Sequence, residues 1–255
     1  MELHGASPYT YRTTNQIPDS VFKVSDTLTS RAEIGDLAVK FKDEVVAIIG
    51  LGGSGSYLLD FLAKTPISEI RAFDLDAFHI HNAFRSPGKL DIEEFMKPKA
   101  EVYMSRYENF RHGLHVHAKY IQSDSTEELE GVTFAFVCVD KATPRIEISN
   151  LLISLGIPFI DVGMGLNREK GTIDGMLRAT YFPAGSTHED INNGMLQLHD
   201  ATDDVYRTNI QIAELNALNA CLAVIKYKQI RGFYADSEQY QHMLLSVHDL
   251  SVAGS

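Results

Sequence analysis

The sequence predicts an α/β fold with a doubly wound, mostly parallel twisted sheet and a C-terminal extension of β structure and helix. Three observations lead to this prediction: short uninterrupted apolar runs, stretches of helical spacing, and the regular alternation of the two along the chain. Apolar runs of about five residues are typical of parallel strands that are buried on both faces. Their alternation with helices indicates a parallel sheet covered by helices on both sides.

The first strand, helix and strand form the clearest unit. Residues 45–49 are all apolar, a glycine-rich segment follows at 50–55, and apolar residues then recur at helical spacing over 57–62. A second strand at 70–73 ends at Asp74. The whole unit has about thirty residues, the size expected of a strand–helix–strand motif.

The remaining predicted elements continue this alternation of strands and helices. We expect strands at 114–121, 133–139 and 157–162, further β structure at 171–182, and helices at 91–109, 143–155 and 209–232. In terms of domains, residues 1–30 are predicted to be an irregular N-terminal arm, 31–240 one globular domain and 241–255 a C-terminal tail. The polar, acidic stretch at 185–204 is predicted to be a mobile loop.

Composition limits the function classes. The chain has 44% hydrophobic and 22% charged residues and a net charge of −11, which argues against nucleic acid and anionic membranes as main partners. Its two cysteines form no Cys-x-x-Cys pair, so they predict neither a disulfide framework nor a cysteine zinc site. No apolar run reaches the roughly 18 residues of a membrane span. We therefore expect a cytoplasmic protein without zinc.

The glycine-rich segment predicts a nucleotide site. Gly50, Gly52 and Gly55 have the spacing of a dinucleotide-binding loop, Gly53 lies between them, and a helix follows directly. Such a Rossmann-like turn lets a phosphate approach the backbone and the helix N-terminus. Asp74 lies about 20 residues further on, where a carboxylate can bind ribose hydroxyls. A turn without ligand is the structural alternative, and the loop by itself would equally suit NAD.

The segment after the second strand favours ATP over NAD. It carries Asp76, which could hold Mg²⁺, and then Asn82 and Arg85 three positions apart, as on one face of a helix. Amide and guanidinium groups at this spacing can bind a triphosphate, whereas hydride transfer has no need of them. The groups suit a reaction in which phosphate departs.

Five segments in a fixed order resemble the ubiquitin-activating superfamily, which includes the ThiF, MoeB and HesA adenylyltransferases. They are VAIIGLGGSGS, DLDAFHIHNAFR, KPKAE, VCVDKATPR and NIQIAELNALNA, and the resemblance covers about residues 31–235. It implies a ThiF-like adenylation domain over 31–240, with ATP and Mg²⁺ as cofactors.

The resemblance also implies roles for individual residues. Asp74 would bind the ATP ribose, with Asp76 as a weaker ribose or metal contact, and Asn82 and Arg85 would bind the phosphates. Lys99 would act on the α-phosphate and the attacking carboxylate.

Two further roles follow from the same resemblance. Asp140 would coordinate Mg²⁺ at the end of its strand. Arg31 would contact the ATP bound to the partner subunit of a two-fold homodimer. The long C-terminal helices would form part of the dimer interface. Independently of the resemblance, Gly163-Met164-Gly165 follows a strand end at the expected ligand edge of the sheet, so its glycines either shape a groove for an extended substrate tail or simply turn the chain.

The expected reaction is adenylation of the C-terminal carboxylate of a ubiquitin-like protein, with a conjugating enzyme as a further candidate partner. The family's zinc cysteines are missing, and Cys138 and Cys221 lie in apolar surroundings unsuited to a thioester nucleophile. Three alternatives stay open: adenylation of a small-molecule or tRNA-linked carboxylate, an NAD-dependent oxidoreductase, and a nucleotide-free partner subunit.

Overall fold

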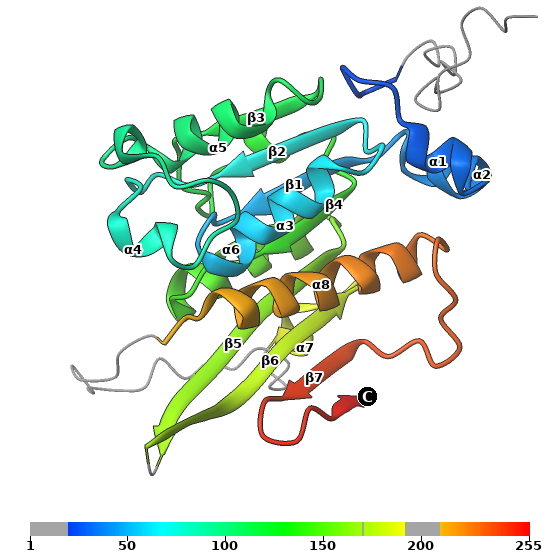
Figure 1. The fold of residues 1–255 in the computed structure, drawn as a ribbon. Helices are drawn as coiled ribbons and strands as arrows, with labels where there is room; N and C mark the ends of the chain where they lie inside the picture. The colour runs from blue at the N-terminus through cyan, green and yellow to red at the C-terminus, as the bar shows by residue number, and fades with distance from the viewer. Residues whose placement is uncertain (1–19, 170, 192–209) are drawn as a thin grey trace, which may run out of the picture.

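The computed structural model describes residues 20–169, 171–191 and 210–255, which form an eight-stranded sheet in the order β3-β2-β1-β4-β5-β6-β7-β8 (Figure 1). The strands from β3 to β5 are parallel, and β6, β7 and β8 are added antiparallel. This confirms the predicted doubly wound, mostly parallel sheet. The strands are β1 (Val45–Ile49), β2 (Glu69–Phe73), β3 (Leu114–His117), β4 (Phe134–Val137), β5 (Phe159–Glu169), β6 (Thr172–Phe182), β7 (His242–Ser246) and β8 (Val252–Gly254).

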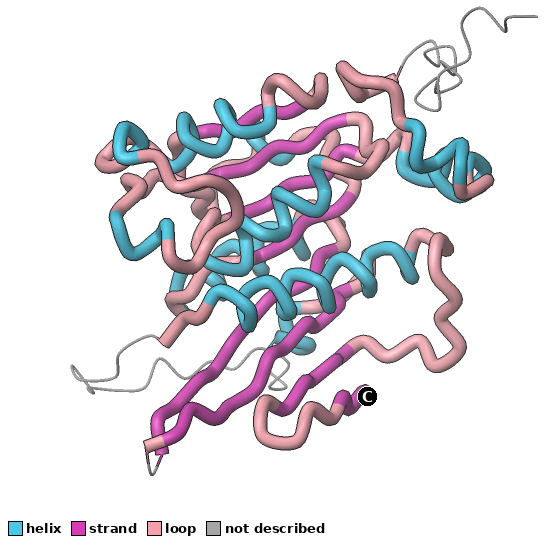
Figure 2. Tube along the Cα trace, viewed as in Figure 1, coloured by secondary structure: helices cyan, strands magenta, loops and turns pink. Residues whose placement is uncertain are grey.

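Helices cover both faces of the sheet (Figures 1 and 2). The α-helices are α1 (Thr27–Arg31), α2 (Gly35–Ala38), α3 (Gly53–Ala63), α4 (Ile80–Ala83), α5 (Lys99–Tyr107), α6 (Ala142–Ser154), α7 (His188–Asp190) and α8 (Ala213–Ile230). Three short 3-10 helices lie at Val39–Phe41, Ile92–Glu94 and Glu127–Leu129. No helix in these described ranges is long and apolar enough to cross a membrane.

The apolar strand β1 contributes to two separate cores. Val46 and Ile48 pack into the larger cluster with residues of α3, α5 and α8, whereas Ala47 and Ile49 pack into the second cluster with residues of α6. Successive side chains of a strand point to opposite faces, so a strand without polar residues requires cover on both. This packing fixes the carboxyl end of β1, and with it the glycine loop, in the middle of the sheet.

The structure differs from the prediction over residues 91–109. A helix was expected along this whole stretch, but α5 begins only at Lys99. Met96 has a positive φ of 68°, which a helix does not accommodate, and Pro98 precedes the first turn of α5. The break places Lys99 in the first turn of α5, facing the carboxyl ends of the strands.

The chain ends also differ from expectation. The segment 241–255, expected to be a tail, contributes β7 and β8 to the sheet, and β7 pairs with β6. The expected irregular arm 1–30 ends in α1, which Asp26 caps by accepting hydrogen bonds from two backbone N–H groups. Residues 1–19 and most of the predicted mobile loop at 185–204 lie outside the described residues.

Candidate active site

A cavity of about 1460 Å³ runs along the carboxyl ends of the central strands, from the glycine loop to the β5–β6 hairpin. Parallel sheets of this type bind ligands at this edge. Most of the predicted site residues line the cavity, namely Gly50, Gly52, Gly53, Asp74, Asp76, Arg85, Lys99 and Asp140. The structure thus brings together residues that are up to 90 positions apart in the sequence.

The glycines of the loop serve different purposes. A Cβ atom on Gly55 would lie 1.9 Å from the carbonyl oxygen of Gly50, and one on Gly53 would lie 2.3 Å from the side chain of Asn216. These two glycines permit close packing between α3, the loop and α8. A Cβ on Gly52 would meet nothing within 4 Å. Gly52 precedes α3, which has no side-chain cap, so the first N–H groups of the helix are available to an anion.

Asp74 ties the loop to the second strand. It is buried, and its carboxylate accepts hydrogen bonds from the backbone N–H groups of Leu51 (2.7 Å) and Asp76 (2.9 Å). Lys99, which is also buried, donates to Asp74 at 3.2 Å and to Asp76 at 3.0 Å. Lys99 therefore lies at the cavity wall between the two carboxylates that were predicted to bind the nucleotide.

Asp76 is the exposed member of this cluster, with 53% of its side chain accessible. Burial raises the pKa of Asp76, but hydrogen bonds from Tyr120 and Lys99 and the charge of Lys99 outweigh it, so the pKa lies below its ordinary value. The Tyr120 hydroxyl donates to Asp76 at 2.7 Å, and this bond raises the pKa of Tyr120 to about 12. Tyr120, which also lines the cavity, was not predicted from the sequence.

Arg85 carries a buried donor suited to a ligand. Its Nε atom is buried and has no hydrogen-bond partner among the described residues, although the side chain lines the cavity. The Arg85 carbonyl accepts a long hydrogen bond (3.5 Å) from Asn216 of α8, which holds this loop against the helix. A buried guanidinium donor without a partner is costly unless an anion binds there, which fits a phosphate group.

Asn82 and Arg31 lie apart from the cavity lining. The Oδ1 atom of Asn82 accepts a hydrogen bond from the backbone N–H of His79 at 2.8 Å, so this buried side chain caps the short helix α4. Arg31 is exposed on α1, beside the opposite end of the parallel strands (Figure 1). A role for Arg31 in the site of a second copy, and one for Asn82 at a phosphate, stay predictions.

Asp140 follows β4 and lines the cavity with an exposed side chain. The described residues contain no group of three His, Cys, Asp or Glu side chains that could hold a metal ion. A single carboxylate nevertheless suits Mg²⁺ that arrives with a nucleotide, because this ion usually takes one or two carboxylates together with phosphate and water oxygens.

The far half of the cavity contains charged side chains that were not predicted from the sequence. Arg145 of α6 and Arg178 of β6 both line the cavity, and both pair with Asp161 of β5, which is fully buried. The distances are 3.4 Å from Arg145 Nε and 2.6 Å from Arg178 Nη2 to the carboxylate oxygens. Arg145 also donates twice to the carbonyl of Val139.

Two asparagines connect α8 to this site. Asn216 and Asn219 are completely buried, and Asn219 donates to the carbonyl of Gly163 at 3.0 Å. The sequence does contain a signal for them, because two amides three positions apart within an apolar helical stretch are unusual unless they have buried partners.

The two arginines of the far half differ in how far the sequence could reveal them. Arg145 stands in a segment already noted for Asp140. Nothing local in the sequence identifies Arg178 or its pairing with Asp161.

Both cysteines lie in surroundings that suppress their reactivity. Burial raises the pKa of the Cys138 thiol far above its ordinary range, and Asp161 adds to the effect. Burial also raises the pKa of Cys221. The thiolate is the nucleophilic form, so these directions agree with the prediction that neither cysteine is a thioester nucleophile.

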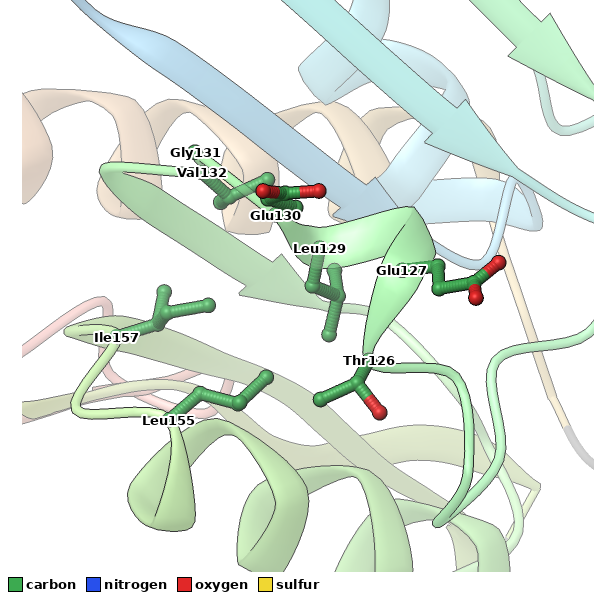
Figure 3. Close-up of a pocket in the computed structure, with 8 residues that line it drawn as sticks. All are labelled: Thr126, Glu127, Leu129, Glu130, Gly131, Val132, Leu155 and Ile157. Carbon is green, nitrogen blue, oxygen red and sulfur yellow. The ribbon is translucent and has the colours of Figure 1, made fainter.

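A second hollow, of about 390 Å³, lies beside the start of β4 and the end of α6. Leu129, Leu155 and Ile157 surround it, while Glu127 extends away from them (Figure 3). Its described lining contains acidic side chains and no Lys or Arg, so it is unsuited to a nucleotide phosphate.

Comparison with known proteins identifies the family. The family model described as "ThiF family" matches residues 29–167, which is more than half of the chain. The chain belongs to the ThiF family. The match contains the glycine loop, Lys99, Asp140 and β5 as far as Asn167, and it leaves out the cavity-lining residues from Gly175 onward.

Relatives of this ThiF-family chain include ubiquitin-like modifier-activating enzyme 5 from two insects. The chain is 25% identical over 151 residues to the Drosophila persimilis protein, a match that covers 52% of this chain and 38% of the relative. The Aedes aegypti protein is 24% identical, with 52% and 37% covered. The match therefore spans well under half the length of these relatives.

Solved structures share the fold. PaaA superposes with a TM-score of 0.64 at 18% identity, covering 86% of this chain and 65% of PaaA. Escherichia coli MccB with ATP gives the same TM-score, identity and coverage. A complex of MccB with AMPCPP and MccA matches at a TM-score of 0.64 and 17% identity, covering 86% and 65% of the two chains. At these identities the similarity establishes the fold alone.

Proposed function

We propose that this ThiF-family chain is an adenylyltransferase that activates the terminal carboxylate of a polypeptide with ATP. A carboxylate oxygen attacks the α-phosphorus, the new O–P bond forms, and the bond between the α-phosphorus and its bridging oxygen breaks. Pyrophosphate leaves with the electron pair, and the product is an acyl-adenylate. The observation that carries the proposal is the convergence of Arg85, Lys99 and Asp140 on one cavity beside the glycine loop and the N-terminus of α3.

The cations of this site would stabilise the transition state. Attack by a carboxylate adds negative charge to the α-phosphoryl oxygens, and donors aimed there lower the barrier most when the charge develops. Arg85 offers a buried Nε–H without a partner in the described structure, and Lys99 reaches the cavity on a flexible stem. Asp140 would hold the Mg²⁺ that accompanies ATP, which offsets phosphate charge.

Asp74 and Asp76 would have roles that differ from those predicted from the sequence. Asp74 already accepts two backbone N–H groups and Lys99 and is buried, so its main role would be to fix the loop and the lysine. Asp76 is exposed to the cavity and carries a lowered pKa, which keeps it a carboxylate. We propose Asp76 as the main acceptor for the ribose hydroxyls, with Tyr120 fixing its orientation.

The acyl substrate we propose is an extended polypeptide tail, as in a ubiquitin-like protein. The far half of the cavity is lined by Gly163, Gly165 and Gly175 and by Met164 and Met176 of the hairpin, which extends beyond the layer of helices (Figure 1). Glycine backbones can pair with an extended chain, and methionines adapt to varied side chains. The names of the insect relatives, and the MccA present with MccB, support a polypeptide substrate.

Several finer points stay predictions of this proposal. They are a homodimer formed partly by α8, the contribution of Arg31 to the site of a partner, a conjugating enzyme as a further partner, and a cytoplasmic location.

The test is ATP–pyrophosphate exchange by the purified chain with Mg²⁺ and either ubiquitin-like proteins or short peptides. Arg85→Ala, Lys99→Ala and Asp140→Ala are each expected to lower substrate-dependent exchange by about 100-fold or more, because the first two remove a cation at the reacting phosphate and the third removes the proposed Mg²⁺ ligand. Lys64→Ala is the matched control, since Lys64 is exposed and pairs with Asp60 on α3. Exchange that survives all three changes would contradict the proposal, as would a wild type that does not bind ATP.

A further inference from the structure

The charges at the far half of the cavity form a compact unit. The guanidinium groups of Arg145 and Arg178 share the carboxylate of Asp161, so the three groups together carry a net charge of +1. The exposed side-chain fraction is 12% for Arg145, 6% for Arg178 and zero for Asp161. Buried charges are costly unless paired, and a cluster of net positive charge favours a further anion beside it.

The sheet register places Arg178 away from the glycine loop, where the reacting phosphate is proposed to bind. Gly50 follows Ile49, which pairs with Val137 of β4, and Val137 pairs with Asp161 of β5. Arg178 lies on the next strand, opposite Gly163. With about 4.8 Å between neighbouring strands, the β6 backbone at Arg178 is roughly 14 Å from β1.

That separation decides what the unit can contact. A carboxylate that attacks the α-phosphorus must lie within about 3 Å of it. An extended chain advances about 3.3 Å per residue, so a group at the far half of the cavity belongs to the residues that precede the reacting carboxylate by one to three positions. The unit is therefore placed for the substrate tail and not for the triphosphate.

Surrounding contacts hold Arg178 in this place. A Cβ atom on Gly163 would lie 2.7 Å from Arg178 Nη2, so the guanidinium packs directly on the backbone of β5. Asn219 fixes the carbonyl of the same glycine from α8. Burial lowers the pKa of Arg178, and the neighbouring Arg145 lowers it further against the opposing effect of Asp161. A further anion beside these two arginines would relieve their repulsion.

We propose that Arg178, together with Arg145, binds an acidic side chain of the acyl substrate, located within the last three residues of the tail that the enzyme adenylates. The inference rests on the proposed function for the presence of a polypeptide tail, and it adds the chemical class of that tail. Arg178 is a specificity-determining residue in this account. Asp161 orients its guanidinium, and the reaction at the α-phosphate does not involve it.

The experiment uses fluorescein-labelled octapeptides of alanine and glycine with a free C-terminus, in which Glu or Gln occupies each of the last three positions in turn. Binding to the full chain with a non-hydrolysable ATP analogue is followed by anisotropy. We expect the wild type to bind the Glu peptide at one position about tenfold more tightly than its Gln counterpart, the worth of one charge-assisted contact. The exchange assay should show this difference in KM rather than kcat.

Two substitutions of Arg178, one control and one substitute variant test the residue. Arg178→Gln should abolish the preference for Glu while leaving the Asp161–Arg145 pair neutral, and Arg178→Lys should retain part of it. Arg168→Gln, an exposed arginine on the same hairpin, is the control and should keep the preference. If Arg178→Gln does not fold, Gly163→Ala gives the same readout, because the added Cβ displaces the guanidinium.

The inference is overturned if the wild type shows no preference for Glu over Gln at any of the three positions. Absence of binding of either peptide counts as this result. The inference is also overturned if the preference persists in Arg178→Gln. The peptide-binding result is read separately from catalysis. Loss of ATP binding or of exchange in the wild type would count against the adenylyltransferase proposal, whereas loss of charge selectivity alone counts against the Arg178 subsite.

Discussion

The two halves of the cavity are built in opposite ways. In the nucleotide half, one lysine, Lys99, lies between the carboxylates of Asp74 and Asp76, whereas in the acyl half one carboxylate, Asp161, lies between Arg145 and Arg178. The local charge of these groups is −1 in the first cluster and +1 in the second. The two carboxylates suit the neutral hydroxyls of a ribose, while Arg85, Lys99 and the N-terminus of α3 are available to the phosphates.

Burial separates the halves as well. In the cluster of Asp74, Asp76 and Lys99 one carboxylate is exposed, and both Asp74 and Lys99 retain backbone or side-chain partners if a ligand changes the arrangement. In the acyl half the central carboxylate is inaccessible and pairs with both cations, and Arg145 also donates to the carbonyl of Val139. We therefore expect the exposed nucleotide cluster to rearrange more readily than the buried acyl cluster.

The largest expected effect tests this difference between the two clusters. Asp161→Ala should lower the free energy of unfolding by about 3 to 5 kcal/mol, because it leaves two guanidinium groups without their buried counter-ion. Urea unfolding, monitored by circular dichroism, measures the change. Asp76→Ala is the comparison in the other half and should cost far less, since that carboxylate is half exposed. Equal losses in the two variants would remove the distinction between the halves.

A smaller effect is expected at the glycine loop, where packing decides the outcome. Gly55→Ala should cost about 3 kcal/mol of stability, because its Cβ would lie 1.9 Å from a backbone carbonyl that cannot move aside easily. Gly52→Ala should cost under about 1 kcal/mol, since nothing lies within 4 Å of its Cβ. Thermal unfolding of the two variants compares them directly. A Gly52→Ala variant that unfolds as readily as Gly55→Ala would show that the loop is packed throughout.

The halves also differ in how far the sequence could predict them. The glycine loop, Asp74 and Lys99 lie within about 50 residues, and strand–loop–helix patterns determine their placement locally. The Asp161–Arg178 pair depends on the antiparallel register of β6, which no periodicity in the sequence specifies. Asn82 has the spacing predicted for a phosphate contact, and its Oδ1 atom also caps α4, a local contact with a backbone N–H that the spacing does not reveal.

The smallest predicted effect is a pH dependence confined to the nucleotide half. The folded-state pKa of Asp76 is depressed, because hydrogen bonds from Tyr120 and Lys99 and the charge of Lys99 outweigh its partial burial. The stability that this carboxylate contributes is therefore present above the unfolded pKa of about 4 and is lost as the pH falls through the folded value. Asp76→Asn should lower Tm modestly at pH 7, and the difference from wild type should shrink below about pH 4.

Tyr120→Phe sharpens this last prediction, because it removes a hydrogen bond to Asp76 without changing any charge. In that background the Asp76→Asn difference at pH 7 should be smaller, since one of the donors that depress the pKa is gone. Thermal unfolding of the four proteins between pH 3 and pH 7 forms a complete double-mutant cycle. A difference that stays constant across this range would mean that Asp76 gains nothing from being ionised, and the nucleotide half would then owe its geometry to Asp74 and Lys99 alone.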